Sequence, residues 1–177
     1  MTGPAAPLVR SGALDLARQV RLVAFDVDGT LTDGRLYIGA GSELMKAFSV
    51  RDGFGCTLLR RAGIKLAIVT GRHSAIVAHR AAELSFDVVM QGVGNKRDAI
   101  EQLASQTGIS AAQMAFVGDD WPDLPALHAV GLPACVVDAA AELHDVALWV
   151  GSQPPGQGAV REFAEWLLQA QGRLDEL

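Results

Sequence analysis

Short apolar runs alternate with stretches of helical spacing along almost the whole chain, and this alternation constrains the fold most strongly. Each run is short, and all but one are followed at once by Gly, Asp or Thr, which is typical of buried parallel strands bounded by turns. Strands that alternate with helices form a parallel sheet with right-handed crossovers. We therefore predict an α/β fold, a Rossmann-like parallel sheet with flanking helices. The predicted strands are 22–25, 64–69, 86–90, 114–117, 133–137 and 148–150, and the predicted helices are 13–19, 54–62, 74–84, 96–107, 123–129, 139–146 and 159–171.

Two acids follow the first apolar run at once, in the segment Asp26-Val27-Asp28-Gly29-Thr30. Ligands of open α/β sheets bind outside the carboxyl ends of the strands, so both acids are expected at the binding edge. Two carboxylates this close repel each other unless a cation lies between them or one holds a proton. Mg²⁺ prefers oxygen ligands and often shares them with a substrate phosphate. We therefore hypothesise a magnesium site with one Asp as nucleophile and the other as proton donor, although Asp-Gly alone is also a common turn signal.

Polar groups also follow the other predicted strands. Thr70-Gly71-Arg72 ends the second strand, Gly118-Asp119-Asp120 ends the fourth, and Lys96 opens the helix after the third. A lysine at a helix N-terminus is unfavourable unless an anion binds there. Phosphoryl transfer needs a metal, a nucleophile and donors around the phosphate oxygens, and the predicted edge would supply all three.

The four motifs together resemble the haloacid dehalogenase superfamily of aspartate-nucleophile phosphatases. A closer resemblance is to the 3-deoxy-D-manno-octulosonate 8-phosphate phosphatase family, and it covers nearly the whole chain after the first dozen residues. It implies Mg²⁺-dependent hydrolysis of the sugar-acid phosphate through an aspartyl-phosphate, as a step of lipopolysaccharide precursor synthesis. Thr30 departs from the close family, which often has valine there. The resemblance rests on residues 25–34, 50–53, 70–72 and 158–162, and on Lys96 and the motif of 118–123.

The resemblance also implies a role for each matching residue. Asp26 would be the nucleophile, and Asp28 would be the general acid and base. Mg²⁺ would be held by Asp26, by Asp119 and by the backbone carbonyl of Asp28. Thr70 and Lys96 would bind the phosphate, and Lys96 would also hold Asp26 in place. The implied substrate contacts are Asp28, Ser49, Val50, Arg51, Asp52, Gly53, Arg72, Arg80, Lys96 and Asp120.

The distances between motifs leave no room for a cap domain. Only 41 residues separate Asp28 from Thr70, and a predicted β-hairpin at residues 35–48 and one helix use nearly all of them. Another 25 residues separate Thr70 from Lys96. An uncapped site cannot exclude water by itself. We therefore hypothesise that a neighbouring subunit closes the site and that the hairpin pairs with copies of itself, as in the tetramers of the resembling family.

Composition excludes several other classes. The net charge of −5 and the lack of a basic block argue against nucleic acid as a partner. No apolar stretch approaches the roughly 20 residues of a membrane span. The two cysteines lie far apart, which favours a reducing compartment. We expect a soluble cytoplasmic protein with one domain over residues 13–177 and a disordered extension over residues 1–12.

Two alternatives share parts of this pattern. The first is a phosphatase for another sugar acid, such as a nonulosonate 9-phosphate, because the site motifs do not distinguish the sugars. The second is a receiver-like signalling domain, which carries its phosphorylated Asp after the third strand. Here that strand ends in Met90-Gln91-Gly92 without an acid, which disfavours the receiver.

Overall fold

A seven-stranded sheet forms the centre of the computed structural model, which describes residues 6–176. The strand order is β1-β9-β8-β7-β2-β5-β6, and every pairing is parallel except that of β1 with β9. This architecture confirms the predicted α/β class, with β2 inside the sheet between β7 and β5. The strands are β1 (Leu8–Val9), β2 (Leu22–Phe25), β5 (Lys65–Val69), β6 (Val88–Met90), β7 (Met114–Gly118), β8 (Leu132–Cys135) and β9 (Trp149–Val150).

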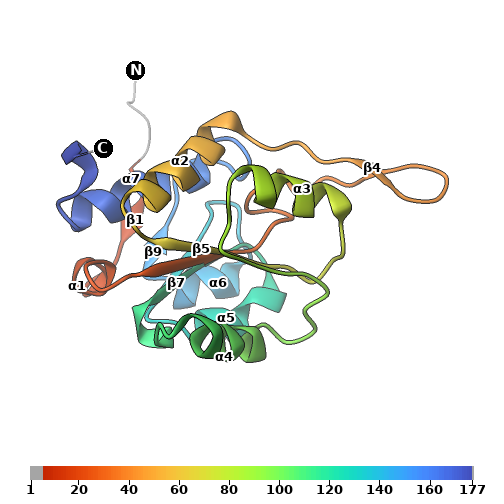
Figure 1. The fold of residues 1–177 in the computed structure, drawn as a ribbon. Helices are drawn as coiled ribbons and strands as arrows, with labels where there is room; N and C mark the ends of the chain where they lie inside the picture. The colour runs from red at the N-terminus through yellow and green to blue at the C-terminus, as the bar shows by residue number, and fades with distance from the viewer. Residues whose placement is uncertain (1–5, 177) are drawn as a thin grey trace, which may run out of the picture.

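Helices cover both faces of this sheet (Figure 1). One face carries α1 (Ala13–Ala17), α2 (Val50–Arg61), α3 (Ala75–Glu83) and α7 (Ala159–Ala170), and the other carries α4 (Lys96–Thr107), α5 (Leu124–Leu127) and α6 (Ala141–Val146). Three short 3₁₀ helices complete the described chain: Ala111–Gln113, Trp121–Asp123 and Leu174–Glu176.

The interior strand β2 shows why the sequence folds into these layers. Side chains of a strand point alternately to the two faces of the sheet. Val23 and Phe25 pack into the core under α2 and α7, whereas Leu22 and Ala24 pack into the core under α4 and α5. A strand buried on both sides needs a continuous apolar run, and β2 is fully buried along its length.

The N-terminal segment differs from the prediction of a disordered extension over residues 1–12. Leu8 and Val9 form β1, opposite Val150 and Trp149 of β9, and the Arg10 backbone N–H donates to the Leu148 carbonyl at 2.9 Å. A two-residue strand is too short to show a periodic pattern in the sequence. Residues 1–5, which the prediction also covered, lie outside the described residues.

Helix α2 begins at Val50, four residues before its predicted start at Phe54. The Ser49 side chain caps it by accepting a bond from the Asp52 backbone N–H at 3.3 Å. Gly53 and Gly55 lie in its first turns, and because glycine has a low helix propensity the sequence does not indicate a helix there. Gly55 is needed there because a Cβ at this position would lie 2.9 Å from the Arg161 Cα of α7. Close packing of α2 on α7 therefore overrides the low helix propensity of glycine.

The predicted hairpin consists of β3 (Tyr37–Ile38) and β4 (Glu43–Met45), which among the described residues pair only with each other. Figure 1 shows it extending beyond α3, away from the main sheet. Its apolar side chains are largely exposed, including Ile38 at 61% and Leu44 at 67%. Within residues 6–176, the hairpin is the whole insertion between β2 and α2, so the prediction of a core without a cap domain is confirmed.

In residues 6–176, no helix combines the length and the apolar character that a membrane span requires.

Candidate active site

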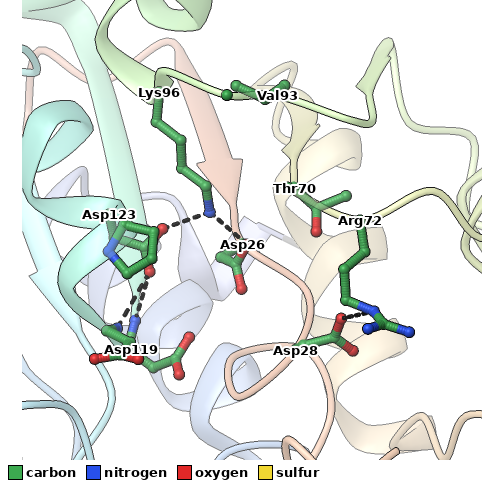
Figure 2. A pocket seen from close by; sticks show the side chains of 12 residues that line it. Asp26, Asp28, Thr70, Arg72, Val93, Lys96, Asp119 and Asp123 are labelled. Carbon is green, nitrogen blue, oxygen red and sulfur yellow. Dashed lines mark hydrogen bonds and ion pairs between the residues drawn. The ribbon is translucent and has the colours of Figure 1, made fainter.

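A pocket of about 210 Å³ opens at the carboxyl ends of β2, β5 and β7 (Figure 2). Parallel strands bring their carboxyl ends to one edge, so segments far apart in the sequence meet here. Seven of the predicted site residues line this pocket, together with five others. The full lining is Asp26, Asp28, Thr70, Gly71, Arg72, Val93, Gly94, Lys96, Asp119, Asp120, Pro122 and Asp123.

Lys96 joins two acids at the bottom of the pocket. It is the first residue of α4, and its Nζ lies 2.5 Å from Asp26 Oδ1 and 2.5 Å from Asp123 Oδ1 (Figure 2). Burial would lower the pKa of Lys96, but the two carboxylates outweigh it and raise this pKa. Lys96 is therefore a buried ammonium that orients Asp26.

Asp123 anchors the acids after β7. Its Oδ1 accepts a bond from Lys96, and its Oδ2 accepts the Asp119 backbone N–H at 2.9 Å and the Asp120 backbone N–H at 3.4 Å. Both of its oxygens are thus already bound. Sequence reasoning gave Asp123 no role. The signal that could have found it is the Gly-Asp-Asp-x-x-Asp motif of residues 118–123, of which Asp123 is the last acid.

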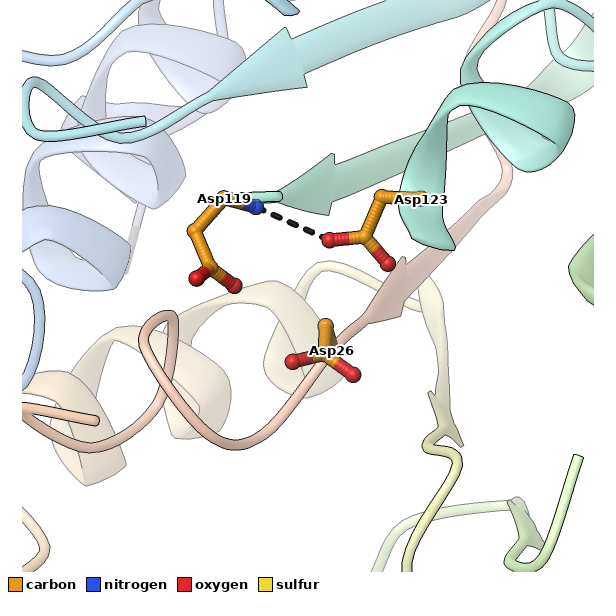
Figure 3. A group of neighbouring side chains, drawn as sticks. All are labelled: Asp26, Asp119 and Asp123. Carbon is orange, nitrogen blue, oxygen red and sulfur yellow. Dashed lines mark hydrogen bonds between the residues drawn. The ribbon is translucent and has the colours of Figure 1, made fainter. Parts of the chain in front are cut away.

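The carboxylates of Asp26, Asp119 and Asp123 converge, each offering an oxygen within 4.8 Å of the others (Figure 3). Burial, with the nearby charge of Asp123, raises the pKa of Asp26 from 3.8 to about 6, against the lowering effect of Lys96. Burial and the charges of Asp26 and Asp123 raise the pKa of Asp119 to about 8. One ammonium does not neutralise three carboxylates, two of them buried and one half-buried, so oxygen ligands here suit a hard divalent cation.

Two residues after β2 shape the approach of Asp119 to this cluster. Gly29 has φ of 97°, and a Cβ on it would lie 2.1 Å from Asp119 Oδ2, so only glycine fits. The buried Thr30 hydroxyl donates to Asp119 Oδ1 at 3.1 Å. Valine at this position would lack that hydrogen bond.

Asp28 lies at the other side of the pocket, between two cations. Its Oδ1 accepts a hydrogen bond from Lys46, and its Oδ2 lies 3.5 Å from Arg72 Nε. Lys46 comes directly after β4 and also lies 2.8 Å from Glu43 Oε1. Sequence reasoning missed Lys46, because a lone lysine after a hairpin strand carries no spacing signal.

Thr70 follows β5 and is buried, with its side chain in the same pocket (Figure 2). Its backbone N–H donates to the Met90 carbonyl at 3.0 Å, which ties the loop after β5 to β6. This bond holds the Thr70 backbone at the edge of the sheet where the pocket opens.

Six predicted substrate contacts do not line the pocket, namely Ser49 to Gly53 and Arg80. The 49–53 segment forms the start of α2, where Asp52 accepts backbone N–H bonds from Gly158 at 3.1 Å and Arg161 at 2.9 Å. Arg80 pairs with Glu83 at 2.8 Å and lies over the Phe48 ring. Their role as substrate contacts stays a prediction.

Comparison with known proteins finds similarity over most of the chain. Residues 50–131 match the model of the haloacid dehalogenase-like hydrolases. The chain is 41% identical over 174 residues to "3-deoxy-D-manno-octulosonate 8-phosphate phosphatase KdsC" of Salmonella typhimurium, covering 98% of this chain and 90% of that relative.

Two solved structures are similar throughout. The cobalt-bound deoxy-D-mannose-octulosonate 8-phosphate phosphatase of Haemophilus influenzae has a TM-score of 0.88 and 40% identity, covering 90% of this chain and 93% of its own. The 3-deoxy-D-manno-octulosonate 8-phosphate phosphatase of Moraxella catarrhalis, in complex with magnesium, phosphate and KDO, has a TM-score of 0.89 and 38% identity, covering 93% and 94%.

Proposed function

Because this chain belongs to the 3-deoxy-D-manno-octulosonate 8-phosphate phosphatase family of haloacid dehalogenase-like hydrolases, we propose that Asp26 carries out its phosphate-ester hydrolysis as a nucleophile. The enzyme is a phosphoric monoester hydrolase. The observation that carries the proposal is the buried Asp26 carboxylate, oriented by Lys96 and set beside Asp119 at the sheet edge. The product would be the free sugar acid for lipopolysaccharide precursor synthesis.

The proposed reaction has two balanced steps. An Asp26 oxygen forms a bond to phosphorus while the bond from phosphorus to the sugar oxygen breaks, and Asp28 in its acid form gives a proton to that oxygen. Water then attacks the phosphorus of the aspartyl-phosphate, and the Asp28 carboxylate takes a proton from it. Free phosphate leaves and the Asp26 carboxylate is restored.

The remaining pocket residues hold the phosphate during these steps. Lys96 and the Thr70 hydroxyl would donate to its oxygens, and Arg72, which is 46% exposed, would meet the anionic sugar. Asp26 and Asp119, with the backbone carbonyl of Asp28, would hold Mg²⁺, and Asp120 beside them would contact the substrate. Mg²⁺ would neutralise charge on the transferred phosphate as a Lewis acid.

Phosphate release from a panel of sugar phosphates tests the proposed substrate. We expect fast release from 3-deoxy-D-manno-octulosonate 8-phosphate and at least about 10-fold lower kcat/KM for neutral sugar phosphates, because Arg72 pairs with the carboxylate of a sugar acid. Nonulosonate 9-phosphates belong in the panel as the rival substrates. Faster phosphate release from one of them would show that this sugar phosphate, and not the octulosonate 8-phosphate, is the substrate.

We further propose that a neighbouring subunit completes the site, within a homotetramer. The pocket of about 210 Å³ is smaller than the roughly 300–1,000 Å³ of usual small-molecule sites, so the sugar would extend beyond it. The nearby hairpin carries exposed apolar side chains, Leu36 at 44%, Ile38 at 61%, Leu44 at 67% and Met45 at 52%. Such a surface on a strand pair suits contact with a second copy.

Leu44→Asp is expected to split this assembly. Light scattering coupled to size exclusion should show a smaller species, and kcat/KM for the sugar-acid phosphate should fall at least about 10-fold, because part of the sugar site is lost. Hydrolysis of 4-nitrophenyl phosphate, which needs only the pocket of one chain, should change less. Leu14→Asp, at a 47% exposed leucine of α1, is the matched control. A wild-type monomer fully active at nanomolar concentration would contradict the proposal.

The acid cluster predicts how Mg²⁺ stabilises the protein at different pH values. The raised pKa values of Asp26, about 6, and Asp119, about 8, mean that the metal-free folded chain holds protons which the unfolded chain releases near pH 4. The stability of the metal-free protein therefore falls as the pH rises through this window. A bound cation replaces those protons, so Mg²⁺ should raise Tm more at pH 8 than at pH 6. Thermal denaturation with and without Mg²⁺ measures this, and a larger shift at pH 6 would contradict it.

A further inference from the structure

We infer that Lys46, from the exit of the β3–β4 hairpin, is a positioning residue that holds the carboxyl of Asp28 in place for proton transfer. This inference rests on the proposed role of Asp28 as general acid and base. The hairpin would thus serve the chemistry within its own chain, besides offering a surface to another subunit.

The geometry around Asp28 separates its two oxygens. Lys46 donates to Oδ1, while Oδ2 is approached only at 3.5 Å by Arg72 Nε. Lys46 fixes one side of the carboxyl, so the other oxygen is the one left to exchange a proton with the substrate. A carboxyl held at one oxygen keeps its distance and angle to the reacting atom, which a freely rotating side chain would not.

Burial distinguishes Lys46 from the cation that faces substrate. The Lys46 side chain is 1% exposed, whereas the Arg72 side chain is 46% exposed. Lys46 is also absent from the pocket lining, which includes Arg72. Lys46 is therefore not placed to contact the sugar acid, and its ammonium acts on the reaction through Asp28.

A second carboxylate holds Lys46 in turn. Glu43 Oε1 lies 2.8 Å from Lys46 Nζ, and Glu43 Oε2 accepts the Ser74 hydroxyl at 2.6 Å. Burial would raise the pKa of Glu43, but the bonds from Lys46 and Ser74 prevail and lower it. Ser74 is the N-cap of α3, where its Oγ accepts the Val77 backbone N–H.

This chain of contacts anchors Asp28 to a rigid element. It runs from Asp28 through Lys46 and Glu43 to Ser74 and the start of α3. Buried charges in such a network are costly unless each has its partner, so loss of one member disturbs the others. Lys46 is the member that contacts Asp28 directly.

A pair of substrates with different leaving groups tests the inference in the full-length assembled enzyme. Nitrophenolate leaves 4-nitrophenyl phosphate as a stable anion, whereas benzyl phosphate and the sugar-acid phosphate release an alkoxide that needs a proton. We expect Lys46→Met to lower kcat/KM for the two alkoxide substrates by about 100-fold, as for loss of general acid catalysis. For 4-nitrophenyl phosphate we expect a loss of less than about 3-fold, because no proton is needed.

Three further variants make the test decisive. Lys65→Met, at an exposed lysine at the start of β5, controls for the substitution itself and should match the wild type. Lys46→Gln keeps a hydrogen-bond donor without the charge, so the difference in kcat/KM loss between the two classes of substrate should be smaller. It replaces Lys46→Met if that variant fails to fold. Equal losses on both classes of substrate in folded Lys46 variants would overturn the inference, since a structural role alone predicts them.

Asp28→Asn separates the inference from its premise. In this variant kcat/KM should also fall more for the two alkoxide substrates than for 4-nitrophenyl phosphate, and this difference should be at least as large as in Lys46→Met. If Asp28→Asn shows this difference between substrates and the Lys46 variants do not, the role of Lys46 alone is overturned. Equal losses on both classes of substrate in Asp28→Asn would overturn the assignment of Asp28 and the inference with it.

Discussion

Asp26→Asn is expected to reduce the turnover of the sugar-acid phosphate by at least about 10⁴-fold, as removal of a nucleophile does in other enzymes. The substitution keeps the shape of the side chain but removes the charge and the attacking oxygen. Initial rates of phosphate release at saturating substrate and Mg²⁺ measure the effect. Wild-type turnover in this variant would show that the assigned nucleophile is wrong.

The fold is not expected to account for this loss. Asp26 lies among buried carboxylates whose repulsion contributes to its raised pKa of about 6, so a neutral amide relieves unfavourable charge. Tm of metal-free Asp26→Asn should equal or exceed that of the wild type. Asp15→Asn in α1, at a carboxyl that is 78% exposed, is the matched control and should retain full activity.

Removal of divalent cations is expected to have the second largest effect. Without a cation, the acids at the pocket repel a phosphate dianion, and Lys96 is already shared between Asp26 and Asp123. A metal contributes several kcal/mol to such a transition state, so excess chelator should lower kcat by at least about 10³-fold. Added Mg²⁺ in excess over the chelator should restore the rate.

The chelator experiment distinguishes catalysis from folding. Circular dichroism should be unchanged by the chelator at 25 °C, because the core of the sheet does not depend on the acid cluster. Undiminished turnover after exhaustive metal removal, verified by elemental analysis, would contradict the proposed site.

Much of the fold could be predicted because its strongest signals are local. Runs such as Leu22 to Phe25 are apolar throughout, since parallel strands under two helical layers are buried on both faces. The predicted helix over residues 96–107 is confirmed as α4, which ends at Gly108 in the left-handed conformation. The strand β1 and the early start of α2 could not be predicted, because they depend on pairing with β9 and on packing against α7.

The candidate site likewise contains residues that local sequence signals predict and others that they do not. Asp26, Thr70 and Lys96 follow strands or open a helix, so topology alone predicts that they meet. Lys46 lies next to Asp28 because the chain returns to the sheet edge directly after β4, and no local pattern encodes that return. Arg80 does not line the pocket and instead lies over the Phe48 ring and pairs with Glu83, so its predicted contact with substrate stays a prediction.

Chemical trapping of the aspartyl-phosphate tests the central claim most directly. Wild-type enzyme would be mixed with sugar-acid phosphate and Mg²⁺, quenched in acid within milliseconds and reduced with borohydride, which converts an acyl phosphate of Asp to homoserine. Mass spectrometry of the digest should find homoserine at position 26 and not in the Asp26→Asn variant. Homoserine at another aspartate, or rapid turnover with none at position 26, would contradict the account.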